Sequence, residues 1–292
     1  MVGKKLIIMT DYSKINWLID TGVEETEYKT GFPKLGDAAE ALGCKVYRTK
    51  YVPFSIDIDS NIPFDNEDCV IAHGCIPFIR QIQSKKNLWC PATYFNDNVK
   101  SFHKYATHIS EYLLAQNWYL IPYGEFIRRK EYMNRPLFIK PNSGLKEFTG
   151  KVIDAYNFNE TIQMMNAFEH VDPDLLCVVT RAMNIDAEFR YVIADKKVVT
   201  KSKYKWHDSL DVHVDTMLEC DELAEKIASL EYQADLVYVC DISCQVHDGV
   251  AFDPRVIELN AFSSSGLYAC DTNAIVKAVS DAAWKEYTGD LD

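Results

Sequence analysis

The sequence lacks any long hydrophobic run. Although 48% of its 292 residues are hydrophobic, no apolar stretch approaches the roughly 20 residues that a membrane-spanning helix needs. The Met1-Val-Gly-Lys-Lys start leads into a short strand-like segment, which is not the apolar core of a signal peptide. These absences argue against membrane insertion, and we predict a globular protein of the cytoplasm that makes no membrane contact.

Paired cysteine motifs are also missing. The nine cysteines form an odd number, and none of them belongs to a CxxC pair. Cys240 and Cys244 are the closest pair, and strand neighbours at that spacing rarely form a zinc site. We expect reduced, mostly buried thiols.

Positive charge is in short supply. The formal net charge is −12 and the pI is near 5.1, whereas a protein that coats nucleic acid needs a basic surface. Nucleic acid is therefore not the expected partner. Local basic clusters at 128–130 and 196–205 still allow a pocket for a small polyphosphate. The sequence leaves the oligomeric state open.

The first hundred residues alternate strand-like and helix-like patterns. Strands are predicted at 5–9, 44–47 and 69–72, and helices at 35–42 and 77–84. Such alternation is typical of a parallel sheet covered by helices. His73 follows a strand at the carboxyl edge of this sheet, where α/β proteins bind ligands. We interpret it as a packed histidine, because the sequence gives it no catalytic partner.

The remaining two thirds of the chain continue as a mixture of helices and strands, without repeats or a low-complexity linker. Apolar residues at helical spacing predict a helix over 99–116, and Asn159 is the expected N-cap of a helix over 159–170. The other predicted elements are strands at 136–141 and 175–179, a hairpin of 188–193 with 198–204, and helices at 222–230 and 273–287.

Three oxygen-bearing side chains near the C-terminus suggest a metal site. Glu258 and Asn260 lie two residues apart in a predicted strand and therefore share one face. Asp241 ends an apolar strand, and the turn signal Asp248-Gly249 predicts a hairpin that brings Asp241 beside Glu258. Such a set suits Mg²⁺ held against nucleotide phosphates. Ordinary strand-end polar residues are the alternative interpretation.

A second feature is the strand-end residue Lys140 and the loop 141–150 that follows it. The loop is rich in small and polar residues, whose backbone N–H groups can bind anions beside the lysine charge. The spacing of a Walker loop is absent. A plain surface turn is the alternative.

Taken together, these residues resemble the ATP-grasp superfamily in order and spacing. The matching features are Phe138-Ile-Lys140-Pro141, the loop, Val178-Val179, Glu188-Phe-Arg190, Asp241 and Glu258-Leu-Asn260. The resemblance spans about residue 99 to the C-terminus, and it is strongest to a clade of phage and bacterial ATP-grasp proteins rich in functional arginine and lysine.

The resemblance implies an α/β (α+β) ATP-grasp fold with three parts. These are a pre-grasp α/β domain at 1–98, a central lid subdomain at 99–180 and a C-terminal antiparallel-sheet subdomain at 181–292.

The resemblance also implies roles for individual residues. The ATP phosphates would be bound by Lys140 and by the lid residues Ser143, Gly144, Lys146 and Thr149. Thr180, Arg181, Ala182 and Met183 would form the hinge that meets adenine, and Glu188 would bind the ribose. A further lysine ahead of the lid would be Lys104, with Lys100 as the alternative. Asp241, Glu258 and Asn260 would hold Mg²⁺, or Mn²⁺ in its place.

Two positions depart from the family pattern. Arg181 stands at the hinge where many members have an acidic residue, which puts adenine recognition by that side chain in doubt. Val239 stands two residues before Asp241, where many peptide ligases have an arginine. We therefore expect the transition-state cation to be Arg190 together with Lys201 or Lys203, because alternation would put Lys201, Lys203 and Lys205 on one strand face. A solvated lysine face is the alternative.

The implied activity is that of an ATP- and Mg²⁺-dependent ligase that joins a carboxylate to an amine through an acylphosphate. Its carboxylate and amine substrates would be small molecules or the terminus of a peptide or protein. A kinase acting on a small molecule, or a nucleotide-binding module without catalysis, would be compatible with the same scaffold. The joint presence of Lys140, Glu188, Asp241, Glu258 and Asn260 favours an enzyme.

Overall fold

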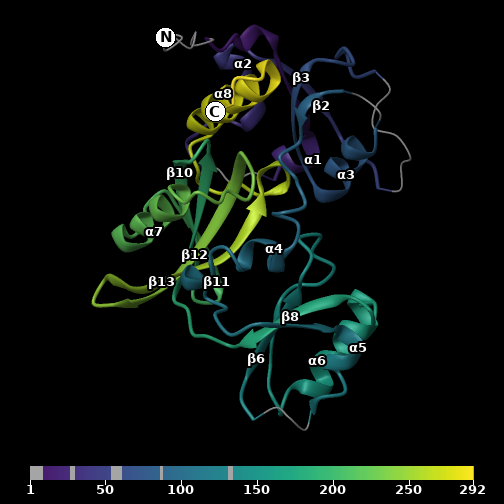
Figure 1. Ribbon diagram of the computed structural model, residues 1–292, viewed down its shortest axis with the longest axis vertical. Coiled ribbons are helices and arrows are strands. Elements are labelled where there is room, and N and C mark those ends of the chain that lie inside the picture. The colour runs from purple at the N-terminus through teal and green to yellow at the C-terminus, as the bar shows by residue number, and fades with distance from the viewer. Residues whose placement is uncertain (1–8, 27–29, 54–60, 86–87, 131–133, 292) are drawn as a thin grey trace, which may run out of the picture.

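A computed structural model describes residues 9–26, 30–53, 61–85, 88–130 and 134–291. Its strands form three sheets, arranged along the molecule as Figure 1 shows. The mixed α/β class and the combination of parallel and antiparallel sheets predicted from the sequence are confirmed. The sheets lie within residues 15–92, 119–181 and 187–261, while the proposed domain boundaries at 98/99 and 180/181 stay predictions.

The first sheet is parallel and has the strand order β2-β1-β3-β4. The C-terminal helix α8 packs against α2 on one side of this sheet, as Figure 1 shows at the top of the molecule. Its elements are η1 (Tyr12–Lys14), β1 (Ile15–Asp20), α1 (Thr21–Glu24), α2 (Leu35–Leu42), β2 (Lys45–Thr49), β3 (Cys69–His73), α3 (Ile76–Ser84), β4 (Cys90–Ala92) and α8 (Thr272–Thr288).

The predictions for this region are largely confirmed. The helix predicted at 35–42 has these bounds in the structure, and β2, β3 and α3 begin or end within two residues of their predicted positions. The strand β1 was not predicted, although its sequence Ile-Asn-Trp-Leu-Ile-Asp is mostly apolar and all six residues are buried. The strand predicted at 5–9 lies almost wholly outside the described residues.

The second sheet is antiparallel, with the order β5-β8-β6-β7. Its core is a separate apolar cluster that includes Ile139, Phe148 and Val179. The helix predicted at 159–170 begins at Phe158 and its N-cap is Asn157, because Asn157 Oδ1 accepts a hydrogen bond from the Asp154 amide and fixes the preceding turn. The elements are β5 (Tyr119–Pro122), α5 (Tyr123–Phe126), β6 (Leu137–Pro141), β7 (Lys151–Ile153), α6 (Phe158–Met164), a π-helical turn (Met165–Glu169) and β8 (Leu176–Arg181).

The third sheet is antiparallel, with the order β11-β10-β9-β12-β13. Both predicted hairpins are present. Their two-residue turns, Asp195-Lys196 and Asp248-Gly249, have positive φ at both positions, which is the conformation that lets a tight turn follow the twist of the strands. The elements are β9 (Ala187–Ala194), β10 (Lys197–Trp206), β11 (Ser209–His213), α7 (Leu218–Ala228), β12 (Val237–His247), β13 (Val250–Ala261) and η5 (Phe262–Ser264).

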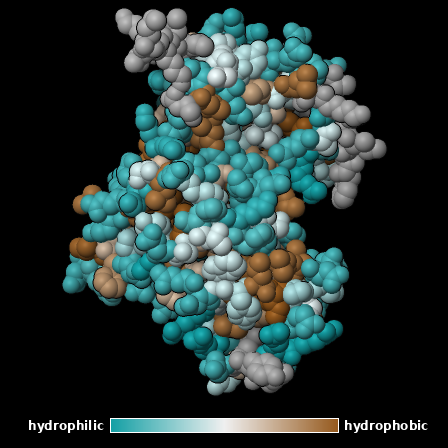
Figure 2. Space-filling view, in the orientation of Figure 1, coloured by the Kyte–Doolittle hydropathy of each residue, from teal (hydrophilic) through white to brown (hydrophobic). Residues whose placement is uncertain are grey.

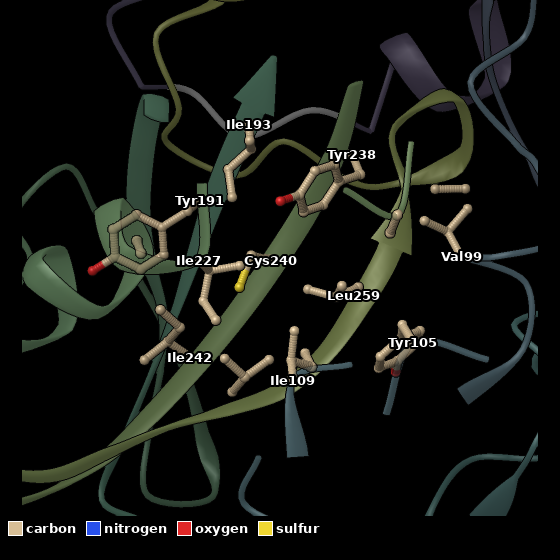
Figure 3. Close-up of a cluster of buried hydrophobic side chains, with 14 of the residues drawn as sticks. Val99, Tyr105, Ile109, Tyr191, Ile193, Ile227, Tyr238, Cys240, Ile242 and Leu259 are labelled. Carbon is tan, nitrogen blue, oxygen red and sulfur yellow. The ribbon is translucent and has the colours of Figure 1, made fainter. Parts of the chain in front are cut away.

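The continuous helix predicted over 99–116 is wrong. Only α4 (Phe102–Ala106) and the short turn η2 (Ser110–Tyr112) are helical in this segment. The segment leaves the helix because Leu113 and Leu114 make backbone contacts with Val256 of β13. The apolar positions are nevertheless buried, and Figure 3 shows Val99, Tyr105 and Ile109 gathered near Leu259.

The surface is mainly hydrophilic, with smaller hydrophobic areas between the polar ones, as Figure 2 shows for one face. Within the described residues, no helix has the length and apolar character required to cross a membrane. All nine cysteines are free thiols and seven of them are buried, which confirms the expectation from their spacing.

Candidate active site

The β12–β13 hairpin brings the three predicted oxygen ligands together. Asp241 is the cross-strand partner of Glu258, and Asp241 is only 2% exposed. The Asn260 amide nitrogen lies 3.0 Å from Asp241 Oδ2 and 3.1 Å from Glu258 Oε1. One side-chain amide therefore bridges both carboxylates within the third sheet.

This donor set fits a small hard cation. Mg²⁺ is usually held by one or two carboxylates together with substrate phosphates, and the cluster offers two carboxylates and one amide. In the described parts of the chain, no three His, Cys, Asp or Glu side chains gather as a metal-binding group. The cluster is thus suited to a cation that a nucleotide helps to hold, rather than to a site built from protein ligands alone.

Lys140 reaches the cluster from the second sheet. Its Nζ lies 2.8 Å from Glu258 Oε2, and its side chain is 13% exposed. The ammonium group also lies over the Phe102 ring, 4.8 Å from its centroid. Burial alone would raise the pKa of Glu258, but the charge and hydrogen bond of Lys140 hold that pKa at about 2. The contact thus fixes an ionised carboxylate between two sheets.

Arg190 is a buried cation in contact with Asp241. The strand register puts the two residues opposite each other on β9 and β12, and Arg190 Nε and Nη2 lie 2.9 and 2.7 Å from the two carboxylate oxygens. Burial alone would lower the pKa of Arg190, but the charge of Asp241 raises it. An arginine is therefore present beside the first metal-ligand candidate, although Val239 stands where many relatives carry one.

Two tyrosine rings cover the other side of this guanidinium. Tyr204 and Tyr268 stack with centroids 4.8 Å apart, and Arg190 Cζ lies 5.4 and 4.9 Å from their respective centroids. Such contacts favour a cation held away from water. Tyr204 also donates a hydrogen bond of 2.6 Å to Glu188.

Glu188 lies in the same polar network. Its second oxygen accepts from Lys205 Nζ at 2.7 Å, and the residue is 9% exposed. The predicted ribose ligand is therefore held by one tyrosine and one lysine at the end of β9 that joins the second sheet.

The structure does not bring Lys201 and Lys203 to this network. The expectation that Lys201, Lys203 and Lys205 share a strand face is wrong, because the pairing of β10 with β9 shifts between Lys203 and Lys205. Lys201 lies opposite Tyr191 and forms an ion pair with Asp221 of α7. Lys203 pairs with Asp211 at 2.6 Å, so only Lys205 of the three reaches Glu188.

The lid loop lies against the segment before α4. The Gly144 amide donates a 2.6 Å hydrogen bond to the Lys100 carbonyl, and Ser143 forms a β-bridge with Ser101. Lys146 and Thr149 are exposed, and Lys146 has a φ of 55°.

A small pocket lies between this loop and the metal strand. Lys100, Gly144 and Lys146 line it together with Asn260. Lys104 is 40% exposed and its Nζ lies 3.9 Å from Asp97. The preference for Lys104 over Lys100 as the lysine ahead of the lid therefore gains no support from the geometry.

The predicted hinge connects the second sheet to the third. Thr180 and Arg181 are the last residues of β8, where they pair with Phe138 and Leu137. The Ala182 amide donates to the Pro136 carbonyl at 3.1 Å. Met183 is 46% exposed and lies in the short connection that leads to β9. The hinge residues are thus close to both sheets.

Tyr204 and Tyr268 were not among the predicted site residues, and Lys205 was considered only as part of the lysine face. No local pattern in the sequence marks the irregular pairing near Tyr204. Tyr268 is a left-handed residue with a φ of 52° in the loop after β13, and its contact with Arg190 depends on a fold that brings residues 78 positions apart together.

Three solved structures are similar to nearly the whole chain. A D-cycloserine synthetase matches with a TM-score of 0.59 and 11% identity over 91% of this chain and 99% of its own. The D-alanine–D-alanine ligase of Bacillus anthracis in complex with ATP matches with 0.58 and 14% over 95% and 99%. A RimK-domain ATP-grasp protein of Sphaerobacter thermophilus matches with 0.57 and 13% over 92% and 99%. These likenesses establish the fold.

The sequence itself identifies the family. No curated protein matches this chain. The model of an ATP-grasp domain, the second family of its clade, matches residues 122–278, which include Lys140, Glu188, Arg190 and the cluster of Asp241, Glu258 and Asn260. The chain therefore belongs to the ATP-grasp family of ATP-dependent ligases.

Proposed function

We propose that the protein uses ATP to join a carboxylate to an amine through an acylphosphate intermediate. The observation that carries this proposal is the meeting of Lys140 from the second sheet with Glu258 from the third at 2.8 Å. This contact brings cationic and anionic side chains of the two sheets to one place. Such an arrangement suits a triphosphate and its counter-ion.

In this proposal the cationic residues neutralise the transferred phosphoryl group. Lys140 and Lys146 act on the phosphates, since both lower the pKa of Glu258 through their charges. Arg190 serves beside Asp241 in place of the arginine that is missing at Val239. Positioning and charge neutralisation are the main requirements of phosphoryl transfer, so these residues need no covalent role.

Asp241, Glu258 and Asn260 would hold Mg²⁺ or Mn²⁺, which would add positive charge at the phosphates when bound. The Asn260 side chain now donates N–H to both carboxylates. Its amide would have to rotate so that its oxygen, the cation-binding atom, faces the cluster. Ser143 and Gly144 would bring the lid over the nucleotide, and Glu188 would accept hydrogen bonds from the ribose.

The chemistry would balance in two steps. A carboxylate oxygen forms a bond to the γ-phosphorus as the bridging bond to the β-phosphate breaks, and ADP leaves. The amine nitrogen then forms a bond to the acyl carbon, phosphate leaves with the electrons of the C–O bond, and the nitrogen loses a proton. Because an acylphosphate reacts with water, closure of the lid would protect it.

The test is ADP release by the purified protein with ATP, Mg²⁺ and a panel of carboxylates and amines. We expect release that requires both substrates, and transfer of ¹⁸O from the labelled carboxylate to phosphate. Nucleotide binding with no ADP release across a broad panel would contradict the proposal. A stable phosphorylated product without any amine requirement would instead identify a kinase.

Two glutamate variants make this test specific. Glu258→Gln keeps the size of the side chain but removes its charge, and we expect at least a roughly 100-fold loss of turnover, typical of losing a charged group at the reacting centre. Glu231→Gln alters an exposed glutamate after α7 and serves as the matched control. Equal turnover in both variants would contradict the metal-site assignment.

A further inference from the structure

The loop that follows the metal-site strand is fastened to the first sheet. His73 Nε2 lies 3.1 Å from the Ser265 carbonyl oxygen. The Gly74 amide donates to the Ser263 carbonyl at 2.9 Å, and the His73 ring packs against Phe262 with centroids 5.4 Å apart. The carboxyl end of β3 thus holds several residues of the loop that begins where β13 ends.

The other end of this loop holds the arginine of the active site. Arg190 Nη1 donates a hydrogen bond of 2.6 Å to the carbonyl of Gly266, the residue that follows Ser265. The same guanidinium donates two further hydrogen bonds to Asp241. His73 is therefore connected to Asp241 through two adjacent peptide carbonyls and one guanidinium.

We infer that His73 is a positioning residue, which sets the location of the Gly266 carbonyl and thereby shares the Arg190 guanidinium between that carbonyl and Asp241. A buried guanidinium needs acceptors for its N–H groups. Without the Gly266 carbonyl, Arg190 would have Asp241 as its main acceptor and would compete more strongly with a cation for that carboxylate. This inference rests on the proposed function only where it concerns cation binding.

The chemistry of His73 fits this role. A carbonyl oxygen only accepts hydrogen bonds, so Nε2 carries the proton in this contact. The residue is 2% exposed, and burial lowers its pKa to about 4. The ring is therefore neutral at neutral pH and keeps a single, directed N–H donor. This arrangement gives His73 a role in the site that its sequence context did not indicate.

The test compares two variants of His73 that differ in one property. His73→Gln retains an N–H donor near the position of Nε2, whereas His73→Leu retains apolar volume and removes the donor. The matched control is Ser280→Ala, which removes the buried hydrogen bond of 3.1 Å from Trp17 to α8 and leaves the loop contacts in place. All three variants are expected to lower the melting temperature.

The decisive readout is the exchange rate of the Arg190 Nε proton, measured by NMR on arginine-labelled full-length protein without ligands and assigned with Arg190→Lys. We expect at least tenfold faster exchange in His73→Leu, and rates within threefold of the unmodified protein in His73→Gln and Ser280→Ala. An unchanged rate in His73→Leu, or equal rates in the Gln and Leu variants, would overturn the inference.

A second readout separates this inference from the proposed function. Mn²⁺ binding in the presence of ADP, followed by electron paramagnetic resonance, should weaken at least fivefold in His73→Leu and stay within twofold in His73→Gln. If the unmodified protein bound no Mn²⁺, the proposed metal site would fail, while the proton-exchange result would still decide the role of His73.

Discussion

The Arg190–Asp241 contact offers the sharpest prediction about stability. Both side chains are buried, with exposures of 5% and 2%, and they share two hydrogen bonds of 2.9 and 2.7 Å. Replacing Arg190 with Met removes the charge but retains an unbranched side chain. Asp241 then becomes a buried carboxylate that keeps the hydrogen bond from the Asn260 amide but has lost its cation.

The expected magnitude follows from the cost of an unpaired buried charge. Removing one partner of a buried ion pair typically costs about 3–5 kcal/mol, and the lost contacts of Arg190 with Tyr204 and Tyr268 add roughly 1 kcal/mol. Arg190→Met should therefore lower the melting temperature by about 6–12 °C, at ~2 °C per kcal/mol for a chain of this size. Thermal and guanidinium unfolding at pH 7.5 would measure the loss.

The companion variant is Arg190→Met with Asp241→Asn, which removes both charges. We expect it to be more stable than Arg190→Met alone by at least ~2 kcal/mol, because no buried charge is left without a partner. A loss below ~1 kcal/mol in Arg190→Met, or strictly additive effects in the double variant, would refute the idea that these residues form one charge-compensated unit.

Two further predictions concern other parts of the fold. Burial raises the pKa of Asp235 to about 7, so the folded state binds its proton more tightly than the unfolded state, and this stabilisation declines as pH rises from about 4 to 7. Asp235→Asn should accordingly raise the melting temperature at pH 8 by a few degrees relative to its effect at pH 5, and equal shifts at both pH values in a thermal scan would contradict this reasoning. At Gly74, an added Cβ would lie 2.5 Å from both Asp20 Cβ and Phe78 Cδ1; Gly74→Ala should cost about 1–3 kcal/mol through overpacking, and an unchanged guanidinium midpoint would show that the loop adapts freely.

Local patterns in the sequence were sufficient for much of the architecture. The helix at 35–42 and the Asp248-Gly249 hairpin followed from periodicity and turn chemistry, because these features act over a few residues. The helix over 99–116 failed for the opposite reason. Its apolar spacing was that of a helix, but contacts with β13 at Val256 draw the segment out of helical form.

The same division applies to the candidate site. The spacing of Glu258 and Asn260 places both on one strand face, and the turn fixes Asp241 opposite Glu258. No such rule applied to the lysines of β10, since one irregularity in pairing separates Lys205 from Lys201 and Lys203. The roles of all these residues in binding and catalysis stay predictions until the variants are measured.

The sequence by itself determined the ATP-grasp family and the order of the charged residues along the strands, because strand periodicity and tight turns are local properties of the chain. Only the tertiary structure decided which charges meet. Lys140 and Glu258 are 118 residues apart and belong to different sheets, while Arg190 faces Asp241 through the register of two strands. Such contacts depend on sheet pairing and domain packing, which bring together residues that no local pattern connects.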